Sequence, residues 1–130
     1  MIIQTSIDVE DVIRQVLSDY FNAYCRPLPK DFKVPSILVQ QVGGTDENTI
    51  DTFEVVLDSR AETEAEALVL IRNAVGILKA IAGSQTTALR YVAVNSSGSW
   101  GIDPVRPDLA MCSARLSVVA HEEKTEVNKK

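Results

Sequence analysis

Hydrophobic residues near the start of the chain follow the spacing of an amphipathic helix. From Val9 onward, apolar side chains return every three or four residues as far as Tyr24. This spacing places them on one face of a helix. Ser6 or Asp8 can cap the first turn, and the prolines from Pro27 onward cannot continue the helix. The pattern therefore predicts a helix from Val9 to Tyr24.

The next segment has the pattern of two strands joined by a turn. An apolar run begins at Ile37 and leads into Gly43-Gly44, followed by acidic and amide residues. From Asp51 to Asp58 the side chains alternate, which places Phe53, Val55 and Leu57 on one side of the pleat. The sequence predicts a hairpin whose second strand is buried mainly on one face.

A second helix follows with clear signals at both ends. Thr63 and Glu66 have the spacing of a capping box, in which each side chain accepts a hydrogen bond from a free backbone N–H. Gly83 suits the residue just after a helix, where the backbone takes a left-handed conformation. About half of the helix circumference between them is apolar. These apolar positions are Ala67, Leu70, Ile71, Ala74, Val75, Ile77, Leu78 and Ile81.

Two more strands are predicted, at Ala88–Asn95 and Leu109–Ala120. The second has small apolar residues on one face, which suits close packing against a helix. The segment between them, 96–108, contains glycines and prolines and is predicted to be an irregular loop. The elements follow the order α-β-β-α-β-β, which predicts a single α+β domain over residues 1–121, with a mainly antiparallel sheet covered by two helices. Residues 122–130 are nearly all polar and are predicted to be a disordered tail.

Composition narrows the classes of function. The net charge is −5, the basic residues are scattered singly, and aromatics make up only 5% of the chain. A protein that binds nucleic acid needs clustered basic side chains or stacking aromatics, so binding to nucleic acid as a ligand is disfavoured. Apolar runs are too short for a membrane span, and a signal peptide is not apparent, so we expect synthesis in the cytosol without membrane association.

The sequence offers little for catalysis, and no cofactor or metal site is expected. His121 is the single histidine, and Cys25 and Cys112 lack the spacing of a metal or disulfide motif. We interpret both cysteines as buried thiols. Residues 96–101 contain glycines but lack the lysine and the following helix of a phosphate-binding loop. The chain is therefore expected not to be an enzyme.

Acidic residues crowd the segment between Gly44 and Glu66, where Arg60 is the only basic residue. Asp46, Glu47 and Asp51 lack the alternating ligands and the closing glutamate of a calcium loop. They have two interpretations, an ordinary solvated turn or a negative wall that repels nucleic acid.

Trp100 is the candidate anchor of an interface. In its Gly-Ser-Pro context the side chain either folds onto its own core or inserts into a neighbouring protein, and tryptophan is frequent in both settings. Other candidate interface residues are Tyr91, Arg90, Arg115 and Val69.

These features occur together in a known family. The Ile37–Gln40 strand leading to Val42-Gly43-Gly44, the strand at Asp51–Asp58 with the helix start at Thr63–Glu66, and the tryptophan loop with Asp103-Pro104 resemble the tail terminator proteins of long-tailed bacteriophages. The resemblance covers nearly the whole chain and depends on the order of the motifs. The polar extension after His121 departs from the family pattern.

The resemblance implies a structural virion protein and not an enzyme. Such proteins form a ring, usually a hexamer, on the head-proximal end of the tail tube. The ring stops polymerisation of the tube protein and offers a joining surface to the head connector, and the genome passes through it without specific binding. On this interpretation Asp46, Glu47 and Asp51 line the lumen.

Two other classes remain open from the sequence. One is another neck protein, such as a head-completion or connector protein, which joins the same assembly from the other side. The other is a small α+β ligand-binding domain or enzyme, which requires a pocket with converging polar groups. A ring with a lumen would distinguish the first group from the second.

Overall fold

A computed structural model of the protein describes residues 1–47 and 50–130, with the backbone alone at Asp46 and Glu47. It is a single α+β domain, as the sequence predicts. Its elements are β1 (Ile2–Thr5), α1 (Val9–Ser18), β2 (Asn22–Cys25), β3 (Ser36–Glu47), β4 (Ile50–Ala61), α2 (Glu64–Ile81), β5 (Leu89–Gly101), β6 (Ala110–His121) and β7 (Glu123–Glu126). The element order therefore differs from the predicted one by the additional strands β1, β2 and β7.

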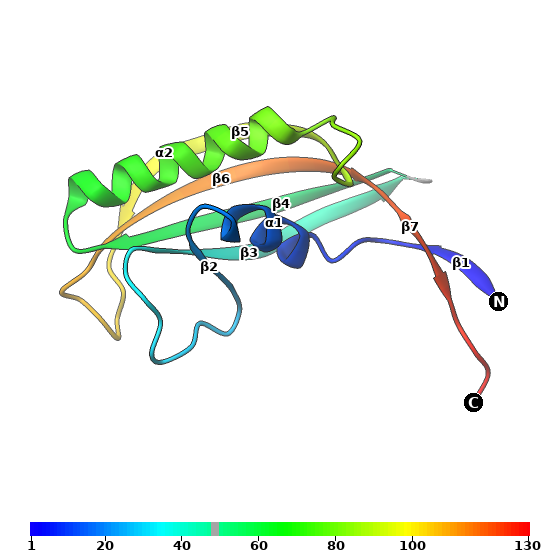
Figure 1. Ribbon diagram of the computed structural model, residues 1–130, viewed down its shortest axis with the longest axis horizontal. Helices are drawn as coiled ribbons and strands as arrows, with labels where there is room; N and C mark the ends of the chain where they lie inside the picture. The colour runs from blue at the N-terminus through cyan, green and yellow to red at the C-terminus, as the bar shows by residue number, and fades with distance from the viewer. Residues whose placement is uncertain (48–49) are drawn as a thin grey trace.

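The body of the molecule is a five-stranded sheet in the order β2-β3-β4-β6-β5. All neighbours are antiparallel except β2 and β3, which are parallel. The helix α2 packs on β4, β5 and β6, and α1 packs on β2 and β3 (Figure 1). The core lies between these helices and the sheet, and the opposite face of the sheet carries most of its polar side chains.

Alternation along the strands selects the residues of the core. In β4, Phe53, Val55 and Leu57 are buried against the helices, as predicted. The face of β6 that carries mostly small apolar side chains is buried as well, because short side chains let α2 approach the sheet closely. The buried residues of β6 are Cys112, Ala114, Leu116, Val118 and Ala120.

The ends of α2 lie where the sequence signals predict them, with one of the two hydrogen bonds of the predicted capping box formed. The Thr63 side chain accepts a hydrogen bond from the Glu66 N–H at 3.2 Å. Gly83 follows the helix with φ +87°, a left-handed conformation that costs glycine little. The predicted apolar face lies against the core, with Ile77 and Ile81 partly buried at its margin.

The first helix is shorter than predicted. Asp8 is its N-cap, and its carboxylate accepts a hydrogen bond from the Asp11 N–H. The helix ends at Ser18, where the Leu17 carbonyl accepts from the N–H groups of both Tyr20 and Phe21. The prediction that it reaches Tyr24 is wrong, because the following residues form β2 along the edge of β3 and gain their hydrogen bonds there.

The fifth strand is longer than predicted. Ser96–Gly101, which the sequence analysis treats as an irregular loop, continues β5 in pairing with β6. The strand accommodates its glycines through irregularities in register, one of them between Ser97 and Ser99. Gly98 lies there with φ +83°. A bulge absorbs an extra residue without ending the pairing, which explains why the composition of this segment was misleading.

The two ends of the chain form a separate ribbon. Together with the last residues of the chain we call it the arm (residues 1–5 and 123–130). β1 pairs with β7 in antiparallel register, and the hydroxyls of Thr5 and Thr125 lie 2.6 Å apart. The arm projects from the body (Figure 1). The prediction of a disordered tail over 122–130 does not hold for Glu123–Glu126, because their pairing partner lies at the opposite end of the sequence.

Candidate interaction surfaces

The His, Cys, Asp and Glu side chains that the structure describes form no cluster of three or more potential ligands. His121 lies exposed at the end of β6, paired in register with Ile50. Burial raises the pKa of the Cys112 thiol and that of the Cys25 thiol, which keeps both in the protonated, unreactive form. Cys112 is buried as predicted, whereas Cys25 is only half-buried. Within residues 1–47 and 50–130, no group of three or more His, Cys, Asp or Glu side chains could hold a metal ion.

Asp51 does not fit the prediction of an exposed acid lining a lumen. Its side chain is 2% exposed, and neither carboxylate oxygen has a hydrogen-bond partner among the described residues. It lies on the same side of β4 as Phe53, so the alternation that buries Phe53 also buries Asp51. The backbone of Asp46 pairs with Asp51 in register. The side chains of Asp46 and Glu47 lie outside the described residues.

The predicted interface residues do not converge on one surface. Tyr91 (62% exposed) and Arg115 belong to the open face of the sheet, where Arg115 lies 3.7 Å from the Glu54 carboxylate. Trp100 (50% exposed) pairs in register with buried Cys112 and therefore belongs to the helix side. Val69 lies exposed on α2.

Arg90 has a structural role in the turn before β5. Its guanidinium donates to the backbone carbonyl of Ser84 at 2.8 Å and to that of Thr87. Because these bonds hold the turn after α2, the side chain is not freely available to a partner.

A buried ion pair that the sequence analysis missed closes the loop between β5 and β6. The Arg60 guanidinium donates to the Asp103 carboxylate at 2.8 Å. The same carboxylate accepts from the N–H groups of Val105 and Arg106. Burial tends to raise the pKa of Asp103, but these hydrogen bonds outweigh it and lower that pKa. Asp103 belongs to a motif that is visible in the sequence. Its partner Arg60 lies in β4, so the pair depends on the fold and has no local sequence signal.

An apolar groove runs along α2 on the side of α1 and β2. One section, of about 530 Å³, is lined by residues that include Phe21, Pro35, Val69 and Leu70. A second section, of about 540 Å³, shares Phe21 with it and continues toward the end of α2. Tyr20 and Arg72 both line this second section. We call the two sections together the α2 groove.

The wall of the α2 groove is fixed by polar contacts at the far side of α1. The Glu10 carboxylate accepts from Arg26 at 2.7 Å and from the Gln41 N–H of β3 at 3.1 Å. Burial tends to raise the pKa of Glu10, but these bonds lower it overall. The first turn of α1 is thereby tied to the sheet, which fixes the position of the helix beside α2.

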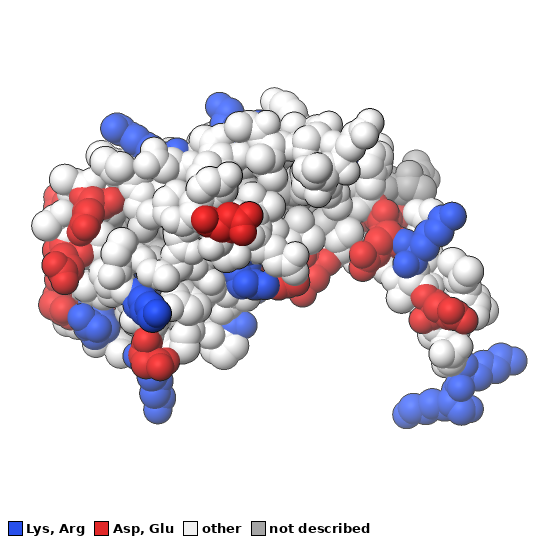
Figure 2. Space-filling view, viewed as in Figure 1, with Lys and Arg blue, Asp and Glu red and all other residues white. Residues whose placement is uncertain are grey.

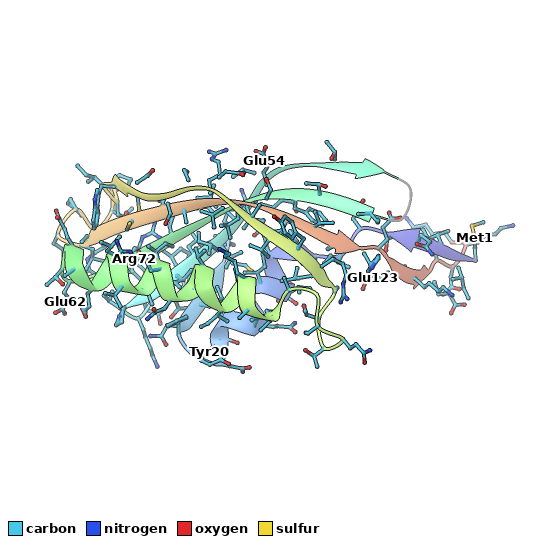
Figure 3. All side chains as sticks on the ribbon, turned by 90° about the horizontal axis from the view of Figure 1, so that it is seen from above. Met1, Tyr20, Glu54, Glu62, Arg72 and Glu123 are labelled. Carbon is cyan, nitrogen blue, oxygen red and sulfur yellow. The ribbon has the colours of Figure 1, made fainter. Side chains whose placement is uncertain are left out.

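Charge is distributed along the long axis of the molecule. Glu62, Glu64 and Glu66 are exposed where α2 begins, whereas the arm carries both glutamates and lysines (Figure 2). Glu62 and Met1 mark opposite ends of the molecule in Figure 3. The two ends therefore present different surfaces.

The chain matches no protein-family model, and no curated protein is significantly similar to it. Neither described helix combines the length and apolar character needed to cross a lipid bilayer.

Proposed function

We propose that this protein is a tail terminator of a long-tailed bacteriophage. It forms a ring, hexameric as is usual for that family, on the head-proximal end of the tail tube. There it stops polymerisation of the tube protein and offers the joining surface for the head connector. The genome passes through the ring without being bound specifically, and the finished protein is part of the virion.

The observation that carries this proposal is the presence of two different exposed apolar surfaces on one elongated domain. The arm exposes Met1, Ile2 and Val127, and the α2 groove exposes Val69 and Tyr20. Two unlike surfaces on one subunit allow head-to-tail contacts, which produce a closed ring when the rotation between subunits closes. The order of motifs that resembles the terminator family supports the same assignment.

A ring of this kind stops growth of the tube because its two sides differ. One side of the ring matches the stacking surface of the tube protein, and the other side offers a different surface. The next tube subunit then finds no matching surface, so growth stops. This mechanism requires only shape and surface chemistry, so it needs neither a metal nor a catalytic residue.

Loss of the protein should remove the stopping signal and leave polymerisation intact. In a phage that lacks it, we expect tubes of abnormal length, or tails not joined to filled heads, by electron microscopy. Wild-type protein added to the extract should restore joining. Trp100→Ala should fold but restore joining poorly, because a half-exposed tryptophan at an interface typically contributes about 2 kcal/mol or more. Trp100→Phe is the matched control and should retain most of the joining activity.

Normal tails attached to heads in the absence of the protein would refute the assignment.

A second candidate, a small ligand-binding domain, is favoured by one observation. Each section of the α2 groove has a volume of about 530–540 Å³, which lies within the usual range for ligand sites. If the protein is such a domain, it should remain a monomer when mixed with tail tubes, and negative-stain images should show no ring. Another neck protein would instead form a ring that binds heads and not tubes.

A further inference from the structure

Among the described residues, the arm shares no strand pairing with the body of the molecule. β1 and β7 are hydrogen-bonded to each other and form a sheet apart from the body. They contact chiefly each other, and Met1 and Ile2 are 80% and 70% exposed. A ribbon of two short strands is marginally stable by itself in water. The arm therefore needs a further surface to be firmly ordered.

The α2 groove has the size and chemistry to receive such a ribbon. From Glu66 to Ala80, the length of α2 that lines it spans about 21 Å at the rise of an α-helix. A strand of four residues spans about 13 Å. The groove offers apolar side chains, among them Val69 and Phe21, to the exposed apolar residues of the arm.

The charges on the two surfaces follow complementary spacings. Along the groove, the acidic Glu66 is followed by the basic Arg72, six residues further on, which corresponds to about 9 Å along a helix. On the arm side, the basic Lys129 lies three residues beyond the acidic Glu126, about 10 Å in an extended chain. All four side chains are exposed, and no ion pair involves them within the described residues.

We infer that the arm of one copy docks in the α2 groove of a second copy, with Lys129 beside Glu66 and Glu126 beside Arg72. The inference rests on the proposed ring assembly and names the contact that builds it. A molecule cannot fill its own groove, because its arm points away from the body (Figure 1). The contact joins unlike surfaces, so repeating it builds a ring when the rotation between subunits closes.

A charge exchange between the two surfaces tests this contact. Glu66→Lys and Lys129→Glu should each weaken self-association, measured by sedimentation velocity over a concentration series at low salt. We expect a loss of about tenfold in the association constant for each, since like charges are then brought together. The double variant restores opposite charges in exchanged positions and should recover most of the association.

The control is Asp31→Lys, which reverses an exposed acid outside the groove lining and should leave association unchanged. Circular dichroism of each variant checks that it is folded.

A second measurement, disulfide crosslinking, does not depend on charge. Ile2→Cys mixed with Val69→Cys should form a disulfide-linked dimer under mild oxidation, whereas Ile2→Cys mixed with Val94→Cys should not.

The inference would be overturned by unchanged association in the single variants, by failure of the double variant to recover it, or by a strictly monomeric wild type. Joining of tails to heads in extract separates this result from the proposed function. If the variants join tails normally, the terminator assignment stands and the arm contact is wrong. If the charge exchange behaves as expected but a phage lacking the protein makes normal tails, the contact stands and the assignment falls.

Discussion

Arg60 and Asp103 connect the body of the sheet to the loop between β5 and β6. Their side chains are 10% and 7% exposed, so the charges are largely removed from water. Arg60 Nη1 is buried without a hydrogen-bond partner among the described residues, which makes the single bond from Nε to Asp103 more important. A buried charge whose partner is removed is strongly unfavourable, because desolvation is no longer offset.

Asp103→Ala is therefore expected to destabilise the protein markedly. Arg60 would remain buried without its counter-ion, and we expect the free energy of unfolding to fall by about 3–5 kcal/mol. The measurement is chemical denaturation followed by circular dichroism. Asp108→Ala is the matched control, since Asp108 pairs with Arg106 at the exposed surface, where solvent screens the pair and its loss should change stability little. Equal losses in both variants would show that the burial of the Asp103 pair has no special importance.

The same aspartate predicts a dependence of stability on pH. Its pKa is lower in the folded protein than in the unfolded chain, where it is about 3.9. Its contribution is therefore complete above the unfolded pKa and disappears as the pH falls through the folded pKa. The free energy by which the wild type exceeds Asp103→Asn should be constant from pH 7 to about 5 and should shrink toward pH 3. A difference that stays constant over the whole range would contradict this prediction.

At the scale of elements, the arm and the five-stranded sheet are nearly independent. The buried core side chains come from α1, α2, the strands β3–β6 and Ile7, which lies just before α1, and among the described residues none comes from β1 or β7. Since hydrophobic burial supplies most of the stability of a fold, the arm should contribute little to that of an isolated molecule. Its strand pairing orders the ends of the chain without extending the core.

Truncation after His121 should consequently leave the melting temperature almost unchanged. The deletion unpairs β1 but leaves every residue of the five-stranded sheet in place. Thermal unfolding by circular dichroism measures the effect, with truncation after Val118 as the control. That control removes buried Ala120 from the end of β6 and should be clearly destabilised. A drop of more than a few degrees on truncation after His121 would show that the arm is docked on its own body.

At the scale of the whole molecule, the chain is elongated and its two ends differ. The start of α2 carries exposed acidic residues, whereas the arm carries acids and lysines beside exposed apolar side chains (Figures 2 and 3). These unlike ends favour head-to-tail contacts over symmetric pairs, because two copies of the acidic end would repel each other. The contact proposed between the arm and the α2 groove therefore follows from the same polarity as the proposed ring. Since exposed charges contribute to it, association should be stronger at low salt.

The sequence by itself determined the elements whose signals are local. The cap at Thr63, the glycine at Gly83 and the alternation of β4 depend on neighbouring residues, and the structure confirms all three. The α+β class follows from the same signals. The burial of Asp51 is also predictable from the sequence, because residues two apart in a strand share a face and Phe53 belongs to the buried face.

Only the tertiary structure decided the features that depend on a distant partner. The end of α1 at Ser18, the strand character of Ser96–Gly101, and the arm all depend on backbone pairing with another segment. The same holds for the ion pair of Arg60 with Asp103. Hydrogen bonds between strands satisfy the backbone N–H and C=O groups whatever the local propensity of the residues. A short, polar or glycine-rich segment therefore becomes a strand when the fold places the edge of another strand beside it.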